Sequence, residues 1–286
     1  MKKYVFISGV STGIGLNAAE YLLEQGYAVW GSVRKEADAK ALEARLGPHF
    51  KAFIFDVCDE QAIEAARKEI ATLLKDQGLH ALVNNAGISV SGPLMYVPVE
   101  DIKYQLDVNV LGVIRLCQAF LPLLGASDPS PYSPGKIINI SSISGRIASP
   151  FIGPYAASKH ALEALSDSLR RELAVFDINV VSIQPGPIKT PIWDKAKADM
   201  AKRSYPNTPY AAIMEKSKEL IAESEREAIE PIAVSRCIHQ ILRSKNPKAR
   251  YIIAKKRLMY WIVSYVLPDR WLDAMIKKRL LGVGKG

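Results

Sequence analysis

The sequence predicts an α/β protein built around a doubly wound parallel sheet of about seven strands. Short runs rich in Val and Ile alternate with longer segments of helical pattern through most of the 286 residues. Turn residues bound the short runs, and strands separated by helices are typical of βαβ units. Crossovers between parallel strands are right-handed, so helices are expected on both faces of the sheet. Such sheets bind ligands at the carboxyl ends of their strands.

The predicted strands span residues 3–8, 27–33, 50–57, 79–87, 136–142, 178–186 and 249–254. The predicted helices span residues 14–25, 35–46, 60–75, 99–124 and 153–176. A surface loop rich in Pro and Ser follows at 125–135, and residues 190–230 are charged and mostly helical. A long charged helical segment such as 190–230 often closes over a substrate. We therefore expect one catalytic domain over 1–254, with a lid at 190–230, and a helical C-terminal extension over 255–286.

Composition narrows the class of protein. Hydrophobic residues make up 49% of the chain and charged residues 23%, as in ordinary globular proteins. Cys58, Cys117 and Cys237 are far apart, which predicts neither a disulfide nor a metal site and fits a reducing, cytoplasmic location. The N-terminal apolar run is too short for a signal peptide. The net charge of +9 can attract anionic partners, but no nucleic-acid motif accompanies it, so no nucleic-acid partner is expected.

The stretch SGVSTGIG, residues 8–15, follows the first predicted strand and opens the first helix. Glycines let a backbone turn tightly and approach a phosphate, and a helix N-terminus adds N–H donors. The spacing Gly9-x-x-x-Gly13-x-Gly15 differs from the usual GxGxxG fingerprint. This stretch predicts a phosphate-binding turn, and the alternative is a tight strand–helix connection.

Arg34 ends the second predicted strand, about 20 residues after the glycines, where an acid would bind the ribose 2′-hydroxyl of NAD. An Arg can instead neutralise the 2′-phosphate of NADP. We therefore favour NADP(H), with NAD(H) and a solvated surface Arg as the alternatives; Ser32 nearby offers a further hydroxyl donor. Asp56 ends the third strand and is expected to accept from an adenine amino group, with Val57 offering its backbone, or to cap the next helix.

Two further strand ends carry polar side chains. In NNAG, residues 84–87, the Asn amides can tie neighbouring strand ends together, and Gly87 admits a ligand close to the backbone. Turn formation is the alternative function for this motif. Ser142 ends the fifth strand, where its hydroxyl can bind a substrate oxygen or cap a turn.

Tyr155 and Lys159 are four residues apart, which places both side chains on one face of the predicted helix. A Tyr ordinarily titrates near pH 10, and a neighbouring ammonium lowers that pKa by favouring the phenolate. The positive nicotinamide of an oxidised cofactor acts in the same direction. The pair thus suits proton transfer while a nicotinamide takes the hydride. An ordinary surface pair is the alternative.

The motifs and their order along the chain resemble those of the short-chain dehydrogenase/reductase family over residues 3 to 191. The matching pieces are SGVSTGIG, Asp56, NNAG, Asn109 in VNVLG, Ser142 in NISSISG, Tyr155-x-x-x-Lys159 and PGPIKT at 185–190. Ser8 stands where the family usually has Thr. Thr12 occupies the position where some NADP-dependent members carry a basic residue, so the expectation of NADP depends on Arg34 alone.

The resemblance implies a Rossmann-like fold and a catalytic set of Asn109, Ser142, Tyr155 and Lys159. Tyr155 would be the general acid/base, and Lys159 would lower its pKa and hold the nicotinamide ribose. Ser142 would orient the substrate oxygen, and Asn109 would bend its helix and hold a water leading from Lys159 to solvent. The implied cofactor contacts are Gly9, Ser11, Thr12, Gly13, Ile14, Gly15, Arg34, Asp56, Val57, Asn85, Ala86, Gly87, Tyr155, Lys159, Pro185, Gly186, Ile188 and Thr190.

Within the family, ALVNNAG, SDSLRREL, PGPIKT and the extended C-terminus look most like the retinol dehydrogenase and 17β-hydroxysteroid dehydrogenase branch. This likeness implies an NADP(H)-dependent oxidoreductase of a bulky apolar alcohol or carbonyl, such as a steroid, retinoid or lipid-like compound. The alternatives are an NAD(H)-dependent dehydrogenase of a small polar substrate and a non-catalytic cofactor-binding regulator. The family's dimer faces imply a homodimer or homotetramer through helices 100–124 and 153–176.

The tail at 257–282 combines an apolar run, Leu258–Leu267, with Tyr260, Trp261 and Tyr265. The run is too short to span a bilayer, which takes about 20 residues. One interpretation is a helix that closes over the active site or a subunit interface. The other is an amphipathic anchor at a membrane surface, because aromatic residues and flanking Lys and Arg suit that position.

Overall fold

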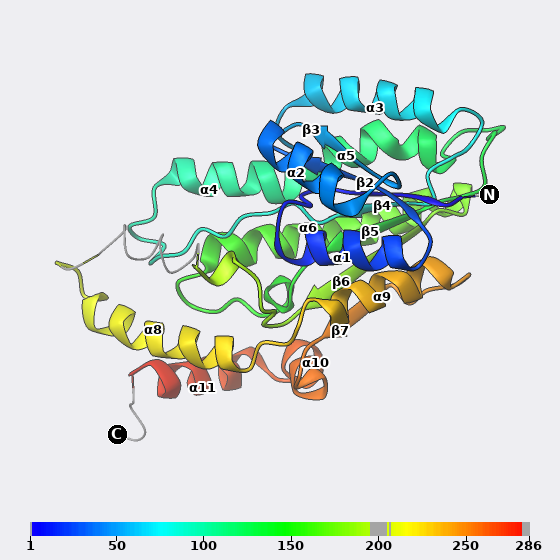
Figure 1. The fold of residues 1–286 in the computed structure, drawn as a ribbon. Coiled ribbons are helices and arrows are strands. Elements are labelled where there is room, and N and C mark those ends of the chain that lie inside the picture. Colours follow the sequence, from blue (N-terminus) through cyan, green and yellow to red (C-terminus); the bar gives the residue numbers. More distant parts are fainter. Residues whose placement is uncertain (1, 195–204, 206, 282–286) are drawn as a thin grey trace.

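The computed structural model describes residues 2–194, 205 and 207–281, and its centre is one seven-stranded parallel sheet (Figure 1). The strands lie in the order β3-β2-β1-β4-β5-β6-β7, so the winding reverses between β1 and β4. This confirms the predicted doubly wound α/β fold. The strands are β1 Tyr4–Ile7, β2 Ala28–Val33, β3 Phe50–Ile54, β4 Ala81–Asn84, β5 Lys136–Ile140, β6 Asn179–Pro185 and β7 Arg250–Ile253. Part of the predicted lid (195–204 and 206) and the end of the predicted C-terminal extension (282–286) lie outside the described residues.

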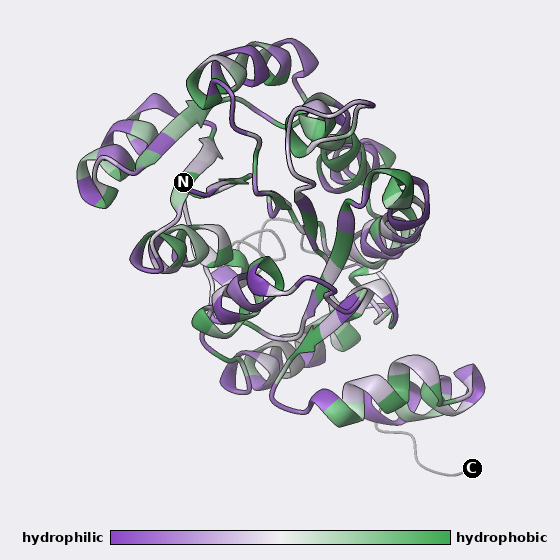
Figure 2. Ribbon diagram, turned by 90° about the vertical axis from the view of Figure 1, so that its right-hand side faces the viewer, coloured by the Kyte–Doolittle hydropathy of each residue, from purple (hydrophilic) through white to green (hydrophobic). Residues whose placement is uncertain are grey.

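Helices cover both faces of the sheet (Figure 2), as the crossover rule predicts. Strand β1 shows how the two cores divide. Val5 and Ile7 belong to the core on one face, whereas Phe6, between them, belongs to the core on the other. The first face is covered by α1 Gly13–Glu24, α2 Glu36–Leu46 and α9 Ile232–Arg243. The second is covered by α3 Glu60–Leu74, α5 Gly112–Phe120 and α6 Gly153–Glu172.

Helix α9 was not among the predicted elements. Its residues Val234, Ile238 and Ile241 recur at helical spacing and are fully buried in the core. Ser235 ties the helix to α1, because its hydroxyl donates to Asn17 Oδ1 at 2.7 Å. The sequence therefore carried an amphipathic signal for α9 next to the charged lid segment.

The predicted helix at 99–124 is present but interrupted. It consists of α4 Val99–Leu106, a π-helical turn η1 Asp107–Leu111, α5, and a 3₁₀ turn η2 Leu121–Leu124. Among the described residues it is the one helix long and apolar enough to cross a membrane by length and composition, and half of its apolar window is buried. It contacts α3 through α5 and α6 through α4 and η1, which is the packing of a core helix.

The C-terminal helices of the described chain lie beside the segment predicted as a lid. Helix α8 Ala211–Arg226 runs next to α11 Asp269–Leu281, and α10 Arg257–Tyr265 follows β7 (Figure 1). Ion pairs join tail and lid, with Arg279 2.5 Å from Glu223 and Lys256 2.6 Å from Glu227. Two short 3₁₀ turns complete the described elements, η3 Ile143–Gly145 and η4 Leu173–Phe176.

Candidate active site

The glycine-rich turn connects β1 to α1 and presents bare backbone. Gly9 and Gly13 have φ angles of 71° and 63°, in the left-handed region that favours glycine. A side chain at Gly15 would collide with Gly9 O and with Asn85 Nδ2. Thr12 is the N-cap residue of α1, and its side chain makes no capping hydrogen bond. The turn therefore places the N–H donors of the first turn of α1 beside a backbone that a phosphate can approach.

Hydrogen bonds tie the ends of β1 and β4 together at this turn. The Ser8 hydroxyl accepts from the backbone N–H groups of Asn85 and Ala86, both at 3.0 Å. Asn85 Nδ2 donates in return to Ser8 O and Gly9 O, both at 2.9 Å. Ser8 thus supplies the hydroxyl expected where the family has Thr. The NNAG motif holds the strand ends together, as its amides predict.

Ser32 belongs to the same frame. Its hydroxyl is 2% exposed and accepts from Gly9 N at 3.0 Å. The suggestion that Ser32 offers a donor near the 2′-position is therefore wrong, because the hydroxyl is buried and fixes the glycine turn.

Arg34 and Asp56 lie at the ends of β2 and β3. Their closest charged atoms are 3.8 Å apart, and the Arg34 side chain is 64% exposed. Exposed pairs contribute only about 0–1 kcal/mol, so the guanidinium can turn towards an anion at little cost. Asp56 Oδ1 accepts from Cys58 N at 3.0 Å. The cap of α3 is Asp59, which accepts from Ala62 N at 2.9 Å, so the helix-cap alternative for Asp56 is wrong.

Tyr155 and Lys159 share one face of α6, as predicted. Lys159 Nζ lies 5.7 Å from the centre of the Tyr155 ring and donates to Ile140 O, at the end of β5, at 2.8 Å. Lys159 is only 6% exposed. The ammonium is therefore held between the helix and the sheet, directly beside the phenol.

Ser142 meets this pair from the end of β5. Its hydroxyl accepts from Ser144 N at 3.0 Å, and its side chain is hydrogen-bonded to that of Tyr155. The capping role and the position at the site coexist. Three of the four predicted catalytic side chains thus come together at the carboxyl end of β5.

Burial is the largest cause of the pKa shifts of Tyr155 and Lys159 on α6. It raises the pKa of Tyr155, and the hydrogen bond from Ser142 opposes that rise. The predicted lowering of the Tyr155 pKa is therefore wrong for the chain by itself, because loss of solvation of the phenolate outweighs the hydrogen bond from Ser142. Burial likewise lowers the pKa of Lys159 to about 8, and the negative charge of Glu163 opposes that fall.

Asn109 lies in the π-helical turn η1, which is the bend expected of it. Its amide clamps the backbone of Ile88, accepting from Ile88 N and donating to Ile88 O, both at 2.9 Å. The amide also donates to Ser158 Oγ at 3.0 Å, and Ser158 Oγ donates to Tyr155 O at 2.7 Å. Asn109 therefore links the segment after β4 to the helix of Tyr155, and a water relay through it stays a prediction.

The remaining cofactor candidates line the same edge of the sheet. Gly87 faces Asn109, because an added Cβ would lie 3.2 Å from Asn109 Oδ1. An added Cβ on Gly13 would lie 3.4 Å from the Thr190 side chain, so the glycine turn and PGPIKT face each other. The other members of the predicted set sit at these strand ends and turns, namely Ser11, Ile14, Val57, Ala86, Pro185, Gly186 and Ile188.

The loop after β6 is fixed by its neighbours. Gly186 N donates to Ile253 O on β7 at 2.9 Å, and Ile188 pairs with Ile229 in an isolated bridge. Trp193 Nε1 donates to Ile188 O at 2.7 Å. PGPIKT is therefore held rigidly at the end of β6, with Thr190 towards the glycine turn.

An aromatic cluster beside the site was not predicted. Ring centroids are 5.9 Å apart for Tyr96 and Tyr205, 6.2 Å for Tyr96 and Tyr210, and 5.9 Å for Phe151 and Tyr210. These rings come from the segment before α4, the segment before α6 and the lid region. The sequence held no signal for the cluster, because only the tertiary fold brings these three segments together.

Comparison with known proteins gives a consistent match. The family description "short chain dehydrogenase" matches residues 3–201. An NADPH-dependent 3-dehydrocapnine reductase of Ornithobacterium rhinotracheale is 42% identical over 278 residues, covering 97% of each chain. Retinol dehydrogenase 16 of Homo sapiens is 33% identical, covering 96% of this chain and 87% of that protein. A short-chain dehydrogenase structure from Streptomyces avermitilis superposes with a TM-score of 0.78 at 22% identity, covering 99% of this chain and 97% of the other.

Proposed function

The chain belongs to the short-chain dehydrogenase/reductase family and resembles its retinol dehydrogenase branch, and on that premise we propose an NADP(H)-dependent oxidoreductase of a bulky apolar carbonyl or alcohol. The observation that carries the proposal is the meeting of Tyr155, Lys159 and Ser142 at the end of β5. These groups lie at the same edge of the sheet as a glycine turn fit for a phosphate.

The residues present fit a nicotinamide cofactor with a 2′-phosphate. The bare turn at Gly9 and Gly13 suits a pyrophosphate, and the exposed guanidinium of Arg34 suits the additional phosphate. The related reductase from Ornithobacterium is named as NADPH-dependent. When bound, the cofactor supplies the hydride. PGPIKT, opposite the glycine turn, would hold the nicotinamide end through Ile188 and Thr190.

The protein's own contribution is proton transfer and orientation. In reduction, the Tyr155 hydroxyl gives its proton to the carbonyl oxygen, and the Ser142 hydroxyl donates a hydrogen bond to the same oxygen. Burial raises the pKa of Tyr155, so the phenol keeps its proton at neutral pH. The Lys159 ammonium stabilises the phenolate as it forms.

The aromatic cluster supports an apolar substrate. Tyr96, Phe151, Tyr205 and Tyr210 form a wall near the amino end of α6, where Tyr155 stands. At the rim, Leu94 is 63% exposed and Met95 is 73% exposed. Pockets that bind bulky apolar ligands are lined predominantly by such side chains, with few polar groups to fix the reacting oxygen.

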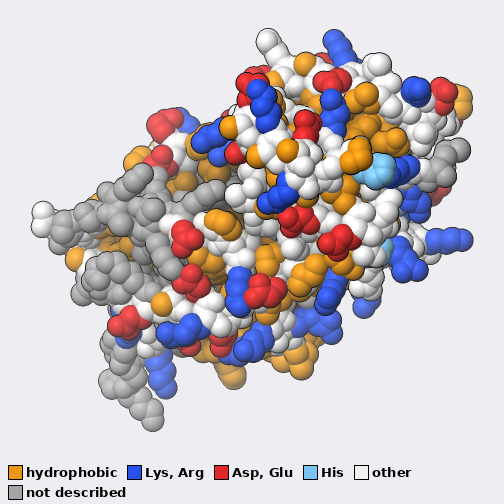
Figure 3. All heavy atoms as spheres, viewed as in Figure 1, with side chains coloured by type: hydrophobic (Ala, Val, Ile, Leu, Met, Phe, Trp, Pro, Cys, Tyr) orange, Lys and Arg blue, Asp and Glu red, His pale blue; other side chains and the backbone are white. Residues whose placement is uncertain are grey.

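The proposal also includes two contacts of the whole molecule, one with further copies of this chain and one with a membrane surface. Tyr104 and Leu111 are exposed on the helix at 99–124 and support pairing into a homodimer or homotetramer. The tail supports contact with a membrane surface, because Leu258, Trp261 and Trp271 are exposed beside many Lys and Arg residues. Figure 3 shows hydrophobic and basic side chains side by side along the lower edge, over α10.

The test of the catalytic proposal is turnover of a panel of apolar ketones and alcohols with NADPH, by wild type and by Tyr155→Phe. Loss of the acid/base hydroxyl is expected to lower kcat by about 10²–10⁴-fold. NADPH affinity, measured by calorimetry, should change little, because the phenyl ring keeps its packing on α6. Near-normal turnover by Tyr155→Phe would refute the assigned role.

A further inference from the structure

Glu163 lies one helical turn beyond Lys159 on α6 and carries a buried carboxylate. Its side chain is 3% exposed. Oε1 accepts from the Ser182 hydroxyl on β6, and Oε2 accepts from Arg250 Nε on β7 at 2.8 Å. Arg146, just after η3, has a guanidinium nitrogen 3.6 Å from the same Oε2. Three separate segments of the fold therefore hold this carboxylate in place.

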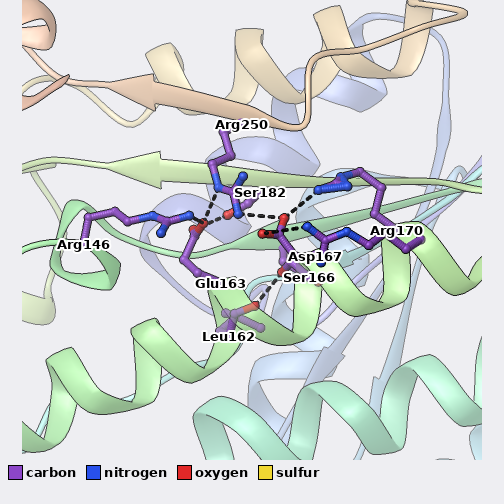
Figure 4. Close-up of polar contacts among 10 residues, drawn as sticks. Arg146, Leu162, Glu163, Ser166, Asp167, Arg170, Ser182 and Arg250 are labelled. Atoms are coloured by element: carbon purple, nitrogen blue, oxygen red, sulfur yellow. Dashed lines mark hydrogen bonds and ion pairs between the residues drawn. The ribbon is translucent and has the colours of Figure 1, made fainter. Parts of the chain in front are cut away.

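A second acid, Asp167, lies in the same cluster, and the two carboxylates contact Arg146, Arg170, Arg171 and Arg250. Arg250 is shared, because it also lies 2.7 Å from Asp167, which in turn lies 2.8 Å from Arg170. Figure 4 shows the guanidinium of Arg250 between the two carboxylates. The cluster therefore fixes the position of the Glu163 carboxylate.

A negative charge near Lys159 would help its buried ammonium to stay protonated. The ammonium is buried, and burial disfavours its charged form. Residues four apart face the same side of a helix, so the Glu163 carboxylate lies on the Lys159 side of α6. Turn η3 closes over this part of the helix, because a Cβ on Gly145 would lie 3.0 Å from both Glu163 Cγ and Lys159 O. The close packing keeps solvent away and strengthens the attraction between the two charges.

Within the part of the chain that the structure describes, the other charged or polar side chains named around Lys159 carry no negative charge. Tyr155, on the same helix, is a neutral phenol when its pKa is raised. Arg146 and Arg250 are cations, and the polar side chains that bond to α6 from η1 and β6, Asn109 and Ser182, are uncharged. Glu163 is therefore the anion that favours the ammonium.

We propose that Glu163 is a positioning residue of the proton-transfer pair, holding the Lys159 ammonium charged and in place while Ser182 and Arg250 fix the carboxylate. The proposal rests on the proposed role of Tyr155 and Lys159. It assigns to the charge cluster of Figure 4 a function at the active site, in addition to joining α6, β6 and β7.

The test is the pH dependence of kcat/KM for NADPH-dependent reduction by Glu163→Gln. Removal of the anion lowers the Lys159 pKa further below 8, so the ammonium loses its proton at a lower pH. The alkaline limb should move down by about one pH unit, which gives about a five-fold loss near pH 8 and little loss near pH 6. A merely structural loss would lower activity equally at both pH values.

Two variants complete the test. Asp167→Asn removes the other acid of the cluster, one turn farther from Lys159, and should leave the alkaline limb in place. Arg250→Gln removes a cation and should move the limb to higher pH, the opposite direction. An unmoved limb in Glu163→Gln, or an equal move in Asp167→Asn, would overturn the proposal. If Glu163→Gln does not fold, Arg250→Gln decides by the same criterion. Failure of the catalytic proposal would appear separately, as turnover by Tyr155→Phe.

Discussion

At the scale of single residues, burial determines what the site can do. Spacing alone placed Tyr155 and Lys159 on one face, and the 5.7 Å between Lys159 Nζ and the Tyr155 ring confirms it. Spacing did not show whether the Tyr155 pKa is raised or lowered, because that shift depends on how far the fold removes solvent from the phenol. Lys159 and Glu163 are also four residues apart, so the sequence places them on one face of the helix. The groups that fix Glu163 come from distant segments, which the sequence does not bring together.

We also expect the choice between NADP(H) and NAD(H) to depend on one residue, Arg34. Arg34→Asp replaces an exposed guanidinium at the end of β2 with an acid beside Asp56. The variant should lose affinity for NADPH, because the 2′-phosphate then meets two carboxylates, and should gain affinity for NADH, whose 2′-hydroxyl can donate to the new acid. We expect the ratio of kcat/KM for NADPH over NADH to fall by about 10- to 150-fold, since a lost charge-assisted bond contributes about 1.5–3 kcal/mol.

The matched control for Arg34 is Lys35→Asp, which makes a change of the same charge at the next residue. Lys35 is the N-cap residue of α2 and is exposed, without a side-chain capping bond. A general electrostatic effect would move both variants alike. Equal cofactor preference in the two would show that Arg34 does not read the 2′-phosphate.

At the scale of elements, the sequence predicted the sheet better than the helices that shape the site. Strands such as β1 could be predicted because a short apolar run ends in a glycine turn. The bend at η1 was expected only from the family resemblance and not from helical periodicity, because Asn109 leaves the regular helix to clamp the backbone of Ile88, a partner 21 residues earlier. The aromatic wall escaped prediction for the same reason, since its rings come from three separate segments.

Helix α9 gives a test of what holds the first face of the sheet. Ile238 is fully buried between α9 and the core, so Ile238→Ala should lower the free energy of unfolding by about 2–5 kcal/mol. Ile262→Ala on α10 makes the same change at a side chain that is 41% exposed and should cost much less. Chemical denaturation of the two variants would measure the difference. Similar losses would show that α10 is as firmly packed as α9.

At the scale of the whole molecule, the tail stands off from the sheet with mixed polar and apolar residues (Figure 2). Helix α10 has no buried residue, and Arg146 contacts it by stacking over Tyr265, with its guanidinium 5.4 Å from the ring centre. Ion pairs to Glu223 and Glu227 connect the tail to the lid helix and the residue after it. A membrane bound by the tail would therefore lie next to the predicted lid, where the proposed apolar substrate would enter.

This arrangement predicts binding to anionic phospholipid vesicles by the full chain. Trp261 and Trp271 are 48% and 68% exposed, and aromatic side chains next to Lys and Arg suit the boundary between headgroups and acyl chains. The double variant Trp261→Ser, Trp271→Ser should lose most of the flotation seen with wild type. Val175→Ser, at an apolar side chain that is 78% exposed on η4, is the matched control and should float like wild type. Equal flotation by all three proteins would mean that the tail is not the anchor, and that its aromatic residues serve another contact. Substitution is preferable to truncation here, because removing α11 would also break the ion pair between Arg279 and the lid.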